Sequence, residues 1–230
     1  MTELYVISSI IILPLILFGL YARTRVNRLY QKYSERPVKK GVTVSRLARA
    51  MLDSAGLNDI PVEEIGVTLE DHYDPRRKVV RLSRRVSRGA SVAAIGIAGH
   101  EAAHAVQDGT GYPPVMLRNS IAPLVERMGH LVLPLLFIGI LFGRLALSSV
   151  FIGVALVFFF AIVLFYLVTL PVELEASARA IRYIEDRDIA DTEELRGVRK
   201  VLRAAALTYL VALALALVQF LNLFTLYRRK

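Results

Sequence analysis

The chain has 230 residues, of which 55% are hydrophobic, and its mean hydropathy of +0.49 is higher than soluble globular domains usually show. It has no cysteine, which excludes a disulfide framework. The formal net charge of +9 would also suit a nucleic-acid-binding protein. The basic residues flank apolar blocks, however, and no nucleic-acid-binding motif accompanies them. Composition therefore predicts a membrane protein that binds no nucleic acid.

The first apolar block covers residues 4–21 and is close to the length that crosses a bilayer as a helix. A cleaved signal peptide is the alternative, but it would begin with positive residues and end at a small-residue cleavage site. Glu3 is the charged residue before the block, and no such site follows it. We therefore expect residues 1–22 to form an uncleaved transmembrane anchor.

Residues 23–118 are expected to lie on the cytoplasmic side of the membrane. Lysines and arginines gather there in membrane proteins, and six of them follow the first block: Arg23, Arg25, Arg28, Lys32, Lys39 and Lys40. Anionic lipid head groups would attract the same side chains, so the lipid bilayer is an expected partner.

Two kinds of secondary structure are predicted within this cytoplasmic part. Apolar residues recur at helical spacing between a polar cap near Thr43 and a stop at Gly56, which predicts a helix. Residues 65–69 alternate between apolar and polar side chains, and residues 79–82 offer a second strand after a turn at Asp74. Together the two strands predict a small β-hairpin.

Residues 91–107 are rich in alanine and free of proline, which predicts a closely packed helix. His100, Glu101 and His104 form an HExxH motif within it. Histidines four residues apart share one face of a helix, and zinc accepts imidazole nitrogen readily. Glu101 lies about 100° further round the helix, from where its carboxylate can take a proton from an attacking water. The alternative is a chance match, against which the helical context argues.

A catalytic zinc needs a further ligand, and no third histidine extends the motif, because Gln107 and Thr110 stand at the positions concerned. His130 opens the second apolar block, where a lone histidine usually belongs to a polar flank. His72 ends the predicted first strand. It can be a turn residue, a metal ligand or a donor to the scissile carbonyl, and all three interpretations stay open.

The remaining apolar blocks predict three further membrane spans. Residues 119–170 contain two of them, separated at Gly143 and Arg144, as a transmembrane helical hairpin. Residues 171–203 are rich in arginine and are expected to form a cytoplasmic helix, and residues 204–230 a last transmembrane helix. The chain is thus predicted to be a mainly α, multi-pass membrane protein with about four spans, an HExxH helix and a small β-hairpin.

Glu173 and Glu175 lie at the start of this cytoplasmic helix, just after a proline that a first helical turn tolerates. A glutamate in that position is often only a solvated cap. The predicted topology nevertheless places both on the same side of the bilayer as His100. They point about 200° apart on a helix, so one of them at most can face a metal there.

Four strings occur in order along the chain: DHYDP at 71–75, VRLS at 80–83, GHEAAHAVQ at 99–107 and LPVE at 170–173. Together they resemble the bacterial neutral zinc metallopeptidases of the YugP-like membrane family, over about residues 40–185. The membrane hairpin between the HExxH helix and the glutamates is also similar to that of the HtpX and CAAX-prenyl-protease group.

The resemblance implies a zinc site with one ion per chain, held by His100, His104 and Glu173, with Glu101 as the base. The related group has an aspartate where this chain has Ser177. The resemblance therefore leaves open which group orients the ligating histidines.

The function implied is that of a zinc metalloendopeptidase that hydrolyses peptides or proteins at the cytoplasmic membrane face. An intramembrane protease of the site-2 type would carry an LDG-like aspartate motif in a later span, and the sequence has none. The alternative from another class is a non-catalytic membrane scaffold with a structural or vestigial zinc site. Glu101 argues against the scaffold, because a purely structural zinc needs no base.

Overall fold

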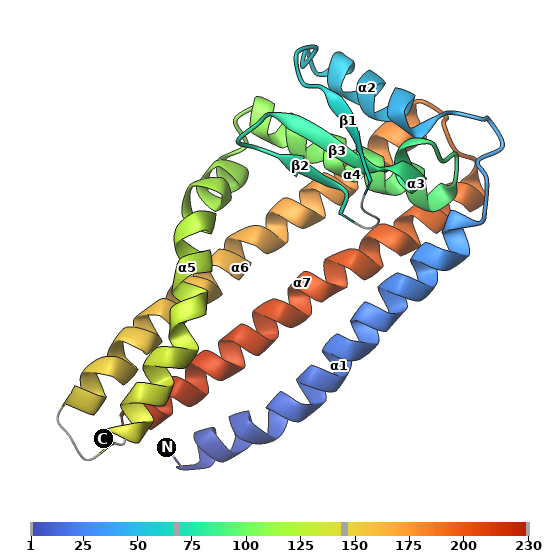
Figure 1. Ribbon diagram of the computed structural model, residues 1–230. Coiled ribbons are helices and arrows are strands. Elements are labelled where there is room, and N and C mark those ends of the chain that lie inside the picture. The colour runs from blue at the N-terminus through green and yellow to red at the C-terminus, as the bar shows by residue number, and fades with distance from the viewer. Residues whose placement is uncertain (1, 67–69, 144–146, 229–230) are drawn as a thin grey trace. The chain divides into compact units, whose positions relative to one another are not determined.

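The computed structural model describes residues 2–66, 70–143 and 147–228 (Figure 1). Within these residues the chain is mostly helical and carries one small sheet, as the sequence predicts. It divides into two compact units, which are described in turn. The first unit contains residues 1–21, 117–170 and 208–230, and the second contains residues 22–116 and 171–207.

Long helices build the first unit and continue beyond it: α1 (Thr2–Ser34), α5 (Pro113–Leu141), α6 (Leu147–Asp186) and α7 (Thr192–Tyr227). All four are long and apolar enough to cross a membrane, which agrees with the predicted number of spans. Large apolar side chains on these helices remain exposed, such as Leu133 at 74% and Phe137 at 68%. An apolar surface of this kind suits contact with lipid. Backbone N–H and C=O groups in lipid must form their hydrogen bonds within the protein, as they do in a helix.

The sequence predicts that a helix begins at Pro171. In the structure α6 instead passes through this proline without interruption. Proline lacks a backbone N–H, so its place inside the helix removes one backbone hydrogen bond. Long membrane helices tolerate this loss because the other bonds of the helix and local adjustments compensate for it. Glu173 therefore belongs to the same continuous helix as the third span.

The single helix predicted for residues 171–203 is also divided, because α6 ends at Asp186 and α7 begins at Thr192. Asp188 lies between them with a φ of 50°, a left-handed conformation that ends a helix. Asp191 then accepts hydrogen bonds from the backbone N–H groups of Glu193 and Glu194, both at the start of α7. A side-chain cap of this kind begins a helix.

The second unit contains three shorter helices, α2 (Val44–Ser54), α3 (Arg84–Ser87) and α4 (Val92–Gly109). The sequence predicts α2 and α4 correctly. Thr43 is the N-cap of α2, and Gly56 follows its end with a φ of 75°. Ser91 caps α4, where its hydroxyl accepts a hydrogen bond of 3.3 Å from the Ala94 N–H.

The sheet has three strands in the order β1-β3-β2, with β1 at Val62–Ile65, β2 at His72–Asp74 and β3 at Val79–Ser83. The hairpin is formed by β2 and β3, whereas β1 pairs with β3 in parallel. The prediction that residues 65–69 form the first strand of the hairpin is therefore wrong. It overlaps β1 at Ile65, and residues 67–69 lie outside the described part of the chain.

The turn of the hairpin explains this pairing. Asp74 accepts hydrogen bonds from the backbone N–H groups of Arg76 and Arg77, and Lys78 has a φ of 52°. These contacts reverse the chain directly after β2, so β2 becomes the antiparallel neighbour of β3.

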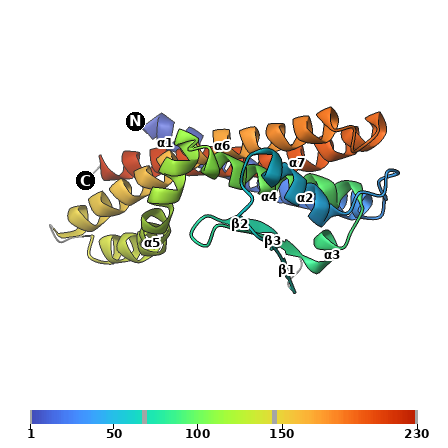
Figure 2. The same ribbon diagram turned by 90° about the horizontal axis from the view of Figure 1, so that it is seen from above.

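α4 is the centre of the second unit. The sheet and α3 lie along one side of it (Figure 2), and α2 also packs on it. Its small side chains let the neighbouring helices approach closely: a Cβ at Gly99 would lie 3.3 Å from Ala180 on α6, and one at Gly96 would lie 3.2 Å from Val198 on α7. The alanine-rich composition of α4 therefore follows from its buried position.

Candidate metal centre

His100 and His104 lie on one face of α4, as the spacing predicts. Their Nε2 atoms are 3.1 Å apart, and their rings meet edge to face with centroids 4.6 Å apart. Two imidazole nitrogens therefore point into the same small volume, which is the arrangement a shared ion requires.

Glu173 enters this volume from α6. Its Oε2 lies 3.2 Å from the Nε2 of His100 and 3.6 Å from that of His104. The side chain is only 3% exposed, and a carboxylate is costly to bury without a charged or hydrogen-bonding partner. Potential ligand atoms of the three residues all lie within 4.8 Å of one another, so together they could hold a metal ion. Two imidazoles and a carboxylate are a donor set that suits zinc.

His72 and Glu175, the other candidates for a ligand, have different partners. His72 is exposed, and its Nδ1 lies 2.7 Å from the carbonyl oxygen of Glu70. Glu175 is not a solvated cap, because its Oε2 accepts a hydrogen bond of 2.6 Å from Gln107 and its Oε1 binds Arg179 at 2.7 Å. His130 lies exposed on α5 and is not a member of the cluster.

Gln107 is fully buried and contacts the other nitrogen of His104. Its Oε1 lies 2.9 Å from the Nδ1 of His104, while its Nε2 donates to the carbonyl oxygen of Val172 at 2.9 Å as well as to Glu175. Because the amide oxygen can only accept, the Nδ1 must carry the proton, and the lone pair of His104 then lies at Nε2, toward Glu173.

Ser177 has the corresponding place beside His100, with its Oγ 3.2 Å from the Nδ1 of that ring. Sequence reasoning left this orienting role unassigned and did not find Gln107. Two spacings could have indicated both residues. Gln107 stands three residues after His104 on α4, and Ser177 stands four residues after Glu173 on α6, so each shares a helix face with a member of the cluster.

Glu101 lies beside the cluster and is held by the sheet. Its Oε2 accepts a hydrogen bond of 3.0 Å from the backbone N–H of Tyr73 on β2. Burial raises the pKa of the Glu101 carboxyl, while the nearby imidazoles of His100 and His104 oppose this shift. A bound cation would oppose it further and favour the carboxylate that a base requires.

The Tyr73 side chain fixes β2 against α4. Its hydroxyl donates to Asp108 at 2.7 Å, and Lys78 forms an ion pair of 2.5 Å with the same carboxylate. Burial and the bond to Asp108 raise the pKa of the Tyr73 hydroxyl, which therefore stays protonated and remains a donor. The free edge of the sheet is thus held next to Glu101.

Comparisons with known proteins identify related sequences. Residues 8–228 match the model of the family described as "Putative neutral zinc metallopeptidase". "Putative membrane protease YugP" of Bacillus subtilis (strain 168) is 44% identical to the chain over 202 residues, which cover 88% of each sequence. No solved structure matches the chain.

Proposed function

The chain belongs to the neutral zinc metallopeptidase family, and on this premise we propose that it is a membrane-bound zinc endopeptidase acting at the cytoplasmic membrane face. One observation carries the proposal: His100, His104 and Glu173 converge within 4.8 Å, with Glu101 next to them. Each of the four residues has the chemistry that hydrolysis of a peptide bond needs at its position.

The proposed ligands of a single zinc ion are His100, His104 and Glu173. When bound, zinc would supply Lewis-acid polarisation of the water and of the scissile carbonyl. The carboxylate of Glu173 contributes a negative charge that two neutral imidazoles lack. Gln107 contacts the Nδ1 of His104, and Ser177 contacts the Nδ1 of His100. These contacts keep both Nε2 lone pairs directed at the proposed metal position.

Glu101 is proposed as the general base. Its carboxylate takes a proton from the attacking water and later gives this proton to the leaving amine. The N–H of Tyr73 holds the Oε2 atom of Glu101 and thereby limits the positions of the carboxylate. A metal site that served structure alone would not need a carboxylate held in this place.

β2 is proposed as the edge that binds an extended substrate. Among the strands that the structure describes, β2 pairs with β3 alone, and its other edge is proposed to pair with the substrate. The Tyr73 N–H donates to Glu101 from this edge, so a peptide paired there would pass beside the base. His72 begins the strand, and its Nδ1 donates to the Glu70 carbonyl, so its Nε2 carries a proton only in the imidazolium form. This imidazolium Nε2–H is the group proposed to donate to the scissile carbonyl.

The cytoplasmic orientation is proposed from the distribution of charge. Arginine and lysine gather in the last part of α1 and just after it, and arginine is frequent over residues 179–203, at the end of α6 and the start of α7. Positive residues of this kind collect on the cytoplasmic side. Glu173 lies on α6, which carries part of the second of these basic segments.

Removal and return of the metal test the proposed function. The purified chain in detergent should hydrolyse a fluorogenic protein substrate, lose this activity with a zinc chelator and regain it when zinc is added in excess of the chelator. A chain that holds zinc yet hydrolyses no peptide in a broad substrate panel would favour the scaffold instead.

A further inference from the structure

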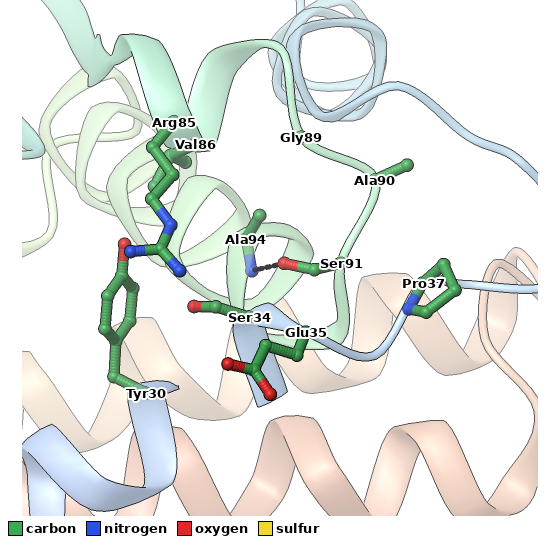
Figure 3. A pocket seen from close by; sticks show the side chains of 10 residues that line it. All are labelled: Tyr30, Ser34, Glu35, Pro37, Arg85, Val86, Gly89, Ala90, Ser91 and Ala94. Carbon is green, nitrogen blue, oxygen red and sulfur yellow. Dashed lines mark hydrogen bonds between the residues drawn. The ribbon is translucent and has the colours of Figure 1, made fainter. Parts of the chain in front are cut away.

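A pocket separate from the metal centre lies where the end of α1 meets α3 and the start of α4 (Figure 3). Its volume is about 190 Å³. It contains none of the four residues proposed for catalysis or zinc binding. The polar side chains that line it are Tyr30, Ser34, Glu35, Arg85 and Ser91. Arg85 and Tyr30 line one side of the pocket, Ser91 and Pro37 line the other, and Ser34 and Glu35 lie between them.

Tyr30 has a hydroxyl group that is buried without a hydrogen-bond partner. The residue is 6% exposed, and in the described part of the chain its hydroxyl forms no hydrogen bond. An unsatisfied buried hydroxyl is costly, and each such group in a folded protein requires an explanation. A ligand in the pocket that Tyr30 lines would supply the missing partner.

Arg85 brings a positive charge to the same side. Its guanidinium carbon lies 5.6 Å from the centre of the Tyr30 ring. Arg84 and Arg88 both bind Glu64, at 3.2 Å and 2.8 Å. Across the described ranges, by contrast, no carboxylate oxygen lies within 4 Å of Arg85. Its charge is therefore available to the pocket.

Ser34 and Glu35 also line the pocket. Neither side chain has a hydrogen bond or an ion pair with any residue that the structure describes, although the next residue, Arg36, pairs with Glu193 at 2.9 Å. The first turn of α4, at Ser91 and Ala94, adds the positive end of a helix dipole. The pocket thus presents positive groups and hydroxyls together with one carboxylate.

We propose that this pocket binds a small zwitterion. Its anionic oxygen group would contact Arg85, the Tyr30 hydroxyl and the start of α4, and its ammonium group would contact Glu35. The volume is below that of pockets for drug-sized ligands, which suits a group of few heavy atoms. A free α-amino acid and a phosphoethanolamine lipid head group share this chemistry.

Calorimetric titration of the full-length protein in detergent tests the proposal. The probes are L-alanine and O-phosphoethanolamine, with acetate, inorganic phosphate and ethanolamine as compounds that carry only one of the two charges. We expect at least one zwitterion to bind about tenfold more tightly than the corresponding singly charged compounds, since a lost charged contact costs at least that much. If L-alanine binds more tightly, the ligand is a free amino acid, and if O-phosphoethanolamine binds more tightly, it is a lipid head group.

Variants locate the binding. Arg85→Gln and Tyr30→Phe should each weaken it about tenfold. Tyr30→Phe should leave the melting temperature unchanged, because the hydroxyl has no bond in the protein to lose. Glu35→Gln should weaken binding of the zwitterion and leave that of acetate or phosphate unchanged. Arg84→Gln, on the same helix but paired with Glu64, is the matched control and should bind as wild type.

Three results would overturn the proposal. The first is that neither zwitterion binds. The second is that singly charged anions bind as tightly as the zwitterions, which would make the pocket a plain anion site. The third is that Arg84→Gln weakens binding as strongly as Arg85→Gln, which would place the ligand elsewhere.

Discussion

Gln107 connects the two helices that carry the proposed zinc ligands. Its amide contacts His104 on α4, and on α6 it contacts the Val172 carbonyl and Glu175. The amide thus fixes the tautomer of a proposed ligand and also the distance between α4 and α6. Neither role follows from the HExxH motif itself.

We therefore expect Gln107→Leu to weaken zinc binding about 10- to 100-fold, because the Nδ1–H of His104 would be buried without an acceptor. Competition with a chromogenic chelator measures the affinity, and nitrogen chemical shifts of the histidine rings in the metal-free protein report the tautomer. Gln31→Leu, at an exposed position of α1, is the control. If Gln107→Leu left the zinc affinity and the nitrogen shifts of the histidine rings unchanged, Gln107 would not orient His104.

The two glutamates of α6 have unequal predicted effects. Glu173→Ala should lose zinc under mild chelation and lose activity, since it removes the one charged ligand. Glu175→Ala should retain zinc under the same conditions. Its effect should be smaller than that of Gln107→Leu, because Gln107 keeps its bond to Val172.

The reverse result, with zinc lost from Glu175→Ala and retained by Glu173→Ala, would exchange the assignments. If both variants retained zinc, the third ligand would lie elsewhere, with His72 as the next candidate.

At the scale of elements, the sequence predicts what is local. The apolar spacing of α2, its N-cap position at Thr43 and the alanine-rich composition of α4 depend on neighbours within a few residues, and the structure agrees with the helices predicted from them. The parallel pairing of β1 with β3 and the contact of Gln107 with α6 join distant segments. Tertiary packing decides such contacts, and no local pattern encodes them.

The edge strand β2 yields a prediction at this scale. His72→Ala should lower kcat and leave zinc binding unchanged, because His72 is exposed and its recorded contact is with the Glu70 carbonyl. Steady-state kinetics and metal analysis of the same preparation provide the measurement. Loss of zinc from this variant would make His72 a ligand and contradict the assignment of Glu173.

At the scale of the whole molecule, four apolar helices and the positions of the basic residues determine the expected topology. Reporter fusions at Lys40 and at Ser87 should indicate the cytoplasm, and a fusion at Arg144 should indicate the opposite side. Paired reporters that are active on only one side of the membrane measure this. If Lys40 and Arg144 lie on the same side, the four-span arrangement is contradicted.

A comparison of the wild-type chain with Glu101→Gln tests whether the chain is a zinc peptidase with Glu101 as its base. Glutamine has nearly the same shape and is expected to accept the Tyr73 hydrogen bond, but it cannot take a proton from water. We expect about one zinc per chain in both proteins and hydrolysis of peptides by the wild type alone. Hydrolysis by Glu101→Gln at the wild-type rate would contradict the role of Glu101 as the base.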